Sequence, residues 1–62
     1  MNVEERILNA CRELAREKGF YRMNMDELAA RAGVSKRTLY RYFRSKEEII
    51  EATIDRFLAE MA

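Results

Sequence analysis

A three-residue turn in the middle of the chain constrains the fold more than any other feature of the sequence. The run Gly33-Val34-Ser35 separates two short amphipathic segments, residues 24–32 and 36–44. Glycine adopts positive φ without steric cost, so the chain can reverse direction here, and Ser35 is a good N-cap for the second segment. Two short helices joined by such a turn pack roughly crosswise. The sequence therefore predicts a helix-turn-helix.

The rest of the sequence predicts two longer amphipathic helices. Apolar side chains recur at spacings of three and four from Val3 to Lys18, and again from Ser45 nearly to the end of the chain. Asn2 and Ser45 are good N-caps, each followed three residues later by a glutamate in the capping-box pattern. Gly19 is suited to end the first helix. We expect an all-α fold, a three-helix, homeodomain-like helix-turn-helix bundle followed by a fourth, C-terminal helix.

The same spacing predicts the core. The residues expected to face inward are Val3, Ile7, Cys11, Leu14, Met25, Leu28, Ala29, Ala32, Leu39, Phe43, Thr53 and either Ile49 or Ile50. Met23 and Leu28 have the spacing of a hydrophobic staple. The apolar side of the last helix is wider than so small a domain can cover, so part of it is expected to have no partner within these residues.

Composition excludes several classes of function. The chain has no histidine and a single cysteine, Cys11, which excludes an internal disulfide and the usual four-ligand zinc site. No glycine-rich phosphate loop and no plausible nucleophile–base pair occur, so we expect neither catalysis nor a cofactor or small-molecule ligand within this chain. Acidic residues are interpreted as helix caps or as partners in weak surface pairs, such as Arg6 with Glu13. No segment has the length and hydropathy of a signal peptide or membrane span, and we expect a cytoplasmic protein.

Positive charge is concentrated in the helix-turn-helix. Residues 31–46 contain six basic side chains and no acidic one, whereas the rest of the chain has six basic and eleven acidic side chains. The chain as a whole has a formal net charge of only +1. A basic cluster confined to one segment is typical of a nucleic-acid-binding surface.

The helical periodicity of the segment that begins at Lys36 assigns candidate DNA contacts. If Leu39 and Phe43 face the core, the opposite side is centred between Arg37 and Arg41, at 100° per residue. We predict base contacts in the major groove from Lys36, Arg37, Thr38 and Arg41, because arginine can donate two parallel hydrogen bonds to guanine. Phosphate contacts are predicted from Tyr40, Tyr42 and Lys46. Lys46 opposes the dipole of its own helix, which is favourable if a phosphate docks there.

The run MDELAARAGVSKRTLYRYFRSKEEII resembles the DNA-binding signature of the TetR (tetracycline-repressor-like) transcription regulators. The resemblance covers essentially the whole chain in order and spacing, including Gly19-Phe20 at the end of the first helix. It implies a recognition helix at Lys36–Phe43 and further DNA contacts from Asn24 and Ser35, which we assign to phosphates. Met23 departs from the family because threonine is common there. Arg37 stands where glycine is frequent, and is an expected source of a distinct base preference.

The resemblance also implies partners. In the family, a larger second domain binds a small ligand and dimerises, and the dimer represses transcription from palindromic operators. We expect residues 1–62 to be a single domain that lacks this second domain and reads double-stranded operator DNA at the bacterial nucleoid, with homodimerisation through the last helix or through the absent domain. Two alternatives stay open. One is a protein-interaction or self-associating module that uses Ile50, Ile54, Phe57 and Met61, and the other is non-specific DNA binding by a monomer.

Overall fold

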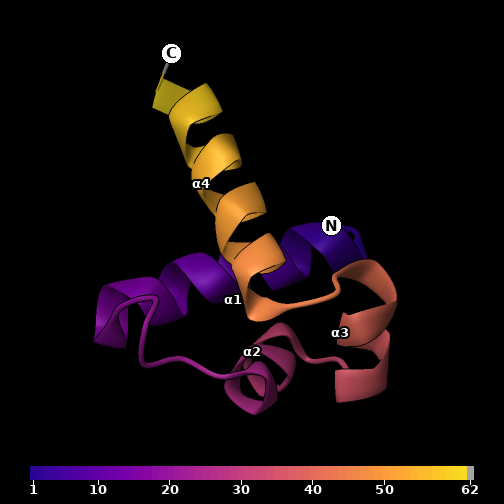
Figure 1. Cartoon of the computed structure of the whole chain (residues 1–62). Helices are drawn as coiled ribbons and strands as arrows, with labels where there is room; N and C mark the ends of the chain where they lie inside the picture. The colour runs from indigo at the N-terminus through magenta and orange to yellow at the C-terminus, as the bar shows by residue number, and fades with distance from the viewer. Residues whose placement is uncertain (62) are drawn as a thin grey trace.

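The part of the chain that the structure describes folds into four helices. The computed structural model describes residues 1–61 and contains α1 (Val3–Lys18), α2 (Met25–Ala32), α3 (Lys36–Tyr42) and α4 (Lys46–Met61). The first three form the base of the molecule, and α4 rises from it so that its C-terminal half projects beyond the others (Figure 1). The predicted all-α architecture, a helix-turn-helix bundle with a fourth helix, is confirmed.

Side-chain caps fix the starts of α1 and α2. Asn24 and Glu27 form a complete capping box, because Asn24 Oδ1 accepts a bond from Glu27 N at 2.8 Å and Glu27 Oε1 accepts one from Asn24 N at 3.2 Å. At α1, Asn2 Oδ1 accepts from Glu5 N at 2.8 Å, but the Glu5 carboxylate bonds the Asn2 side-chain amide rather than its backbone. Each cap satisfies a donor that the first helical turn leaves without a partner.

The turn between α2 and α3 has the geometry of a Schellman motif. Gly33 lies in the left-handed region, with φ 73° and ψ 34°. Its N–H donates to Ala30 O at 3.1 Å, and Val34 N–H donates to Ala29 O at 3.0 Å. These two bonds close α2 and use the positive φ that glycine provides without strain. The predicted role of the glycine is confirmed.

One hydrophobic core joins all four helices. Its buried residues are Ile7, Leu8, Ala10, Cys11, Leu14, Met23, Leu28, Ala29, Ala32, Leu39, Phe43 and Ile49. Val3 and Met25, which the spacing also places inward, are half-buried at its edge. Leu8 is buried although it lies off the predicted stripe, because α1 packs against both α2 and α4. Burial raises the pKa of the Cys11 thiol, which is consistent with its interpretation as a core residue.

The projecting half of α4 leaves apolar side chains uncovered. Ile54, Phe57, Leu58 and Met61 keep between 40% and 70% of their surface exposed. The prediction that part of this stripe has no partner among residues 1–61 is confirmed. No helix in this part of the chain combines the length and the apolar character needed to cross a membrane.

Candidate nucleic-acid interface

The short helix α3 buries one side and presents the other to solvent. Leu39 is fully buried and Phe43, the C-cap residue, is 8% exposed. Arg37 and Arg41 are exposed on the opposite side, and Tyr40 is about half exposed. The predicted orientation of the helix is therefore confirmed. Leu39 is the only buried residue within α3, so its packing largely determines which way the basic side faces.

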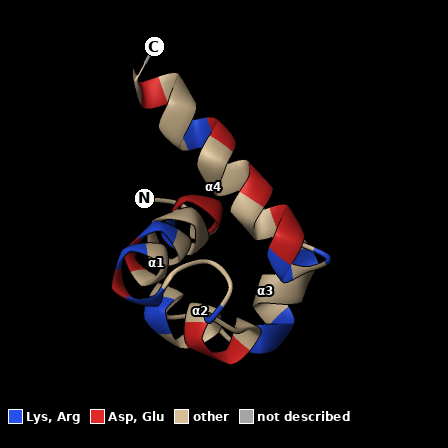
Figure 2. Ribbon diagram, turned by 60° about the vertical axis from the view of Figure 1, so that its left-hand side comes forward, with Lys and Arg blue, Asp and Glu red and all other residues tan. Residues whose placement is uncertain are grey.

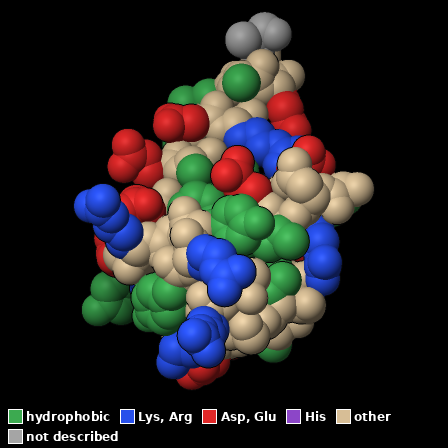
Figure 3. Space-filling model, turned by 90° about the vertical axis from the view of Figure 1, so that its right-hand side faces the viewer, with side chains coloured by type: hydrophobic (Ala, Val, Ile, Leu, Met, Phe, Trp, Pro, Cys, Tyr) green, Lys and Arg blue, Asp and Glu red, His purple; other side chains and the backbone are tan. Residues whose placement is uncertain are grey.

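The charge asymmetry of the sequence is also an asymmetry in space. Basic residues without acidic ones lie on α3, and more lie around the start of α4, whereas α4 is mainly acidic and α1 and α2 carry both signs (Figure 2). On the face shown in Figure 3, Lys and Arg side chains lie mainly over the lower half with hydrophobic side chains between them, and the carboxylates lie mainly above. A surface with this separation attracts a polyanion to one end of the molecule.

The first turn of α3 is held by polar contacts. Ser35 Oγ accepts a hydrogen bond from Thr38 N at 3.0 Å and donates one to Thr38 Oγ1 at 2.9 Å. Lys36 Nζ lies 3.2 Å from Asp26 Oδ1, and this exposed ion pair connects α3 to α2. An exposed pair of this kind contributes little stability and can be exchanged for another anion.

Lys46 joins two distant parts of the chain. Its ammonium group donates to the backbone carbonyls of Tyr21 and Met23, both at 3.2 Å, and lies 5.9 Å from the centroid of the Tyr21 ring. The side chain therefore holds the α1–α2 connection against the start of α4. Because Asn24 directly follows Met23, the two predicted phosphate contacts Asn24 and Lys46 lie on the same side of the domain. Local sequence spacing gives no signal for this contact.

Arg31 belongs to the basic segment, but its side chain is paired with two glutamates of α1. Its guanidinium bonds both carboxylate oxygens of Glu17, at 2.7 and 3.0 Å, and reaches Glu13 at 3.3 Å. The hydrogen bond from Arg31 lowers the pKa of Glu17, and the two glutamates raise that of Arg31. The expected surface pair between Arg6 and Glu13 is wrong, because Arg6 instead donates to backbone carbonyls at the end of α2.

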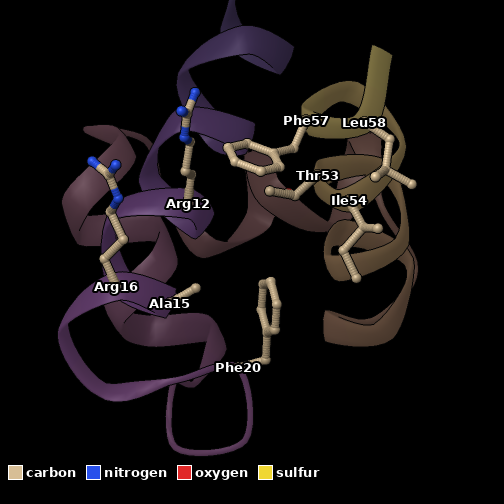
Figure 4. A pocket seen from close by; sticks show the side chains of 8 residues that line it. All are labelled: Arg12, Ala15, Arg16, Phe20, Thr53, Ile54, Phe57 and Leu58. Atoms are coloured by element: carbon tan, nitrogen blue, oxygen red, sulfur yellow. The ribbon is translucent and has the colours of Figure 1, made fainter. Parts of the chain in front are cut away.

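A second surface feature is an apolar groove between α1 and α4. Its volume is about 280 Å³, and it is lined by Arg12, Ala15, Arg16, Phe20, Thr53, Ile54, Phe57 and Leu58 (Figure 4). The Arg12 guanidinium stacks 4.7 Å above the Phe57 ring and pairs with Glu60 at 3.2 Å. The guanidinium groups of Arg12 and Arg16 point away from Phe20, so the groove offers few polar groups to orient a ligand.

Comparisons with known proteins agree with this arrangement. The family model described as bacterial regulatory proteins, tetR family, matches residues 7–53. The HTH-type regulator YvaF of Bacillus subtilis (strain 168), which is named as uncharacterized, is 46% identical over 59 residues, or 95% of this chain and 30% of that protein. UidR of Escherichia coli (strain K12), an HTH-type transcriptional regulator, is 45% identical over 49 residues, or 79% of this chain and 25% of UidR. FasR of Mycolicibacterium smegmatis, an HTH-type transcriptional activator, is 44% identical over 50 residues, or 81% of this chain and 23% of FasR.

The residues that match the family model, 7–53, include the turn between α2 and α3, all of α3 and the first half of α4. The chain spans less than a third of the length of these three relatives. No solved structure matches it. The chain therefore belongs to the TetR family of bacterial regulatory proteins, as a helix-turn-helix domain of DNA-binding transcription regulation.

Proposed function

We propose that this domain reads double-stranded DNA by placing α3 in the major groove, as the operator-reading part of a transcriptional repressor. The exposed side of α3 carries this proposal, because it combines two arginines with a lysine and a threonine and contains no acidic residue. An α-helix fits the major groove, where each base pair presents a distinct pattern of donors and acceptors. The buried side chains of Leu39 and Phe43 fix the opposite side of the helix to the core.

Four residues are proposed to contact bases. Arg37 and Arg41 are exposed one turn apart on the outer side of α3, where each guanidinium could donate two bonds to a guanine. Lys36 and Thr38 flank them. Lys36 would leave Asp26 to reach a base, which costs roughly 0–1 kcal/mol for an exposed ion pair.

Five residues are proposed to contact phosphates, namely Asn24, Ser35, Tyr40, Tyr42 and Lys46. The two tyrosines are about half exposed on the flanks of α3, so each ring packs on the domain while its hydroxyl can reach the backbone of the DNA. Lys46 uses two of its three N–H groups for carbonyls, which leaves one for a phosphate. The oxygen of Asn24 is occupied by the cap of α2, so its amide nitrogen is the group that donates.

We further propose that two copies act together on an inverted repeat in the bacterial cytoplasm. One seven-residue helix contacts only a few base pairs, and a symmetric pair doubles the contacts and fixes the spacing of the half-sites. Residues 1–62 form one DNA-binding domain, and pairing requires either the exposed side of α4 or a separate dimerisation domain. Sedimentation equilibrium distinguishes these sources. A dimer that Phe57→Asp abolishes assigns pairing to α4, whereas a monomer at about millimolar concentration assigns it elsewhere.

The base-reading role of Arg37 provides the test of this proposal. Arg37→Ala should remove discrimination at one base pair, worth roughly 1–3 kcal/mol or about 5- to 150-fold, while other positions keep their preference. Affinities for duplexes with single substitutions measure this directly. Arg44→Ala, which removes the same charge from an exposed residue just beyond α3, is the matched control. Equal weakening of every duplex by Arg37→Ala would show that this residue contacts only phosphate.

A further inference from the structure

We propose that Arg6, on α1, is a positioning residue for DNA recognition, which holds the turn between α2 and α3 without touching the DNA. This inference rests on the proposed function. The guanidinium of Arg6 donates from Nε to the carbonyl of Ala32 and from Nη2 to the carbonyl of Gly33, both at 3.0 Å. One side chain thus ties the first helix of the domain to the turn that leads into the recognition helix.

The carbonyls that Arg6 binds are not used by the hydrogen bonds of the turn. The last carbonyls of a helix have no partner within the helix, and the Schellman bonds satisfy only those of Ala29 and Ala30. The planar guanidinium bridges two other carbonyls, those of Ala32, the last residue of α2, and Gly33, and its positive charge is favourable at the negative end of the α2 dipole. Arg6 therefore adds to the cap of α2 from a position 26 residues away along the chain.

Gly33 makes this approach sterically accessible. A Cβ atom added at Gly33 would lie 2.6 Å from Arg6 Nη2, so any other residue there would displace the guanidinium. The positive φ of the turn and the close approach of Arg6 thus both favour glycine at this position. The contact between Arg6 and the turn therefore depends on glycine at position 33.

The consequence for α3 follows from its length. A helix of seven residues is far shorter than the roughly 12–15 residues at which an isolated helix becomes marginally stable, so its neighbours determine its orientation. Arg6 fixes Ala32 and Gly33, and Ser35, the cap of α3, follows only two residues after Gly33. Base readout depends on which base edges α3 reaches, whereas phosphate contacts carry no sequence information. Loss of Arg6 should therefore reduce specificity more than general affinity.

Binding of the Arg6 variants to two DNA probes tests this. The probes are a duplex selected by the wild-type chain from a random pool, and a scrambled duplex of the same composition. Arg6→Ala should weaken binding to the selected duplex roughly tenfold, the scale of hydrogen bonds to a charged group, with little change for the scrambled one. Arg6→Lys should not restore specificity, because an ammonium cannot reproduce the planar fork. Arg16→Ala, which removes the same charge from an exposed position on α1, should leave specificity unchanged.

Two results would overturn the inference. An equal loss on both duplexes, with a salt slope shallower by about one and recovery in Arg6→Lys, would make Arg6 a phosphate contact. Unchanged specificity in Arg6→Ala would show that the turn does not depend on it. Amide hydrogen exchange gives a readout without DNA. Arg6→Ala should speed exchange at Val34 and Thr38 but not at Thr53, and unchanged exchange at all three also refutes the inference. If the wild-type chain does not distinguish the two duplexes, the proposed function fails, and exchange still tests the contact.

Discussion

Two substitutions in α3, Leu39→Ala and Arg41→Ala, should separate the attachment of this helix to the core from its contacts with DNA. Leu39 is fully buried and is the only buried residue within α3, while Arg41 is exposed on the opposite side of the same helix. Leu39→Ala removes three buried carbon atoms and leaves a cavity between α3 and the core. Arg41→Ala removes a charge from the surface and leaves the packing intact. The first change should act on stability and the second on recognition.

The size of the effect follows from burial. Leu→Ala at a fully buried site costs about 2–5 kcal/mol. A domain of this length is expected to have a free energy of unfolding of about 3–9 kcal/mol, at the usual 0.05–0.15 kcal/mol per residue. Leu39→Ala should thus remove a large share of the stability. Arg41→Ala should change stability by less than about 0.5 kcal/mol, as surface substitutions usually do.

Urea denaturation followed by circular dichroism measures both effects. The midpoint for Leu39→Ala should fall well below that of the wild type, and its affinity for every duplex should fall only as far as the folded fraction falls. Arg41→Ala should unfold at the wild-type midpoint and lose base preference. A loss of less than about 1 kcal/mol in Leu39→Ala, below the range for a buried leucine, would show that this side chain does not anchor α3.

Three further changes test individual contacts. Lys46→Ala should weaken binding to all duplexes alike and make the salt slope shallower by about 1, and an unchanged slope in a titration with salt would exclude the phosphate contact. Because pairing with Arg31 lowers the pKa of Glu17 below its ordinary 4.5, the stabilisation is present above that value and is lost as pH falls through the lowered pKa. Glu17→Gln should therefore lose less stability than the wild type between about pH 5 and pH 3 in urea titrations, and parallel losses would contradict this. Gly33→Ala should cost at least about 1–2 kcal/mol, because a left-handed alanine is strained and its Cβ also displaces the Arg6 guanidinium. Thermal unfolding would detect this loss, and wild-type stability would be contrary to the observed φ of 73°.

Local sequence signals predicted most of the fold. Caps at Asn2, Asn24 and Ser35 and the glycine at position 33 place the ends of the helices where the structure has them, because each acts within three or four residues. The recognition helix ends at Tyr42, slightly earlier than expected. Phe43 has extended dihedral angles, φ −139° and ψ 138°, and its side chain is buried.

Contacts between distant residues could not be predicted in the same way. Arg6, Arg31 and Lys46 each bind a partner that lies 14 to 27 residues away in the chain. Nothing in the sequence pairs Arg31 with Glu17, and only the packing of α2 on α1 brings the two side chains together. The burial of Leu8 also depends on a tertiary contact, since α4 covers a second side of α1.

Selection of bound duplexes from a random pool, at low and at moderate salt, shows whether α3 reads the base sequence of DNA. If α3 reads bases, a defined sequence is enriched, as an inverted repeat when two copies bind together, and Arg37→Ala removes the preference at one base pair of that sequence. Recovery without enrichment, lost steeply as the salt concentration rises, would show general attraction to phosphates alone. Failure to recover DNA at either salt concentration would contradict the assignment of α3 as a DNA-reading helix.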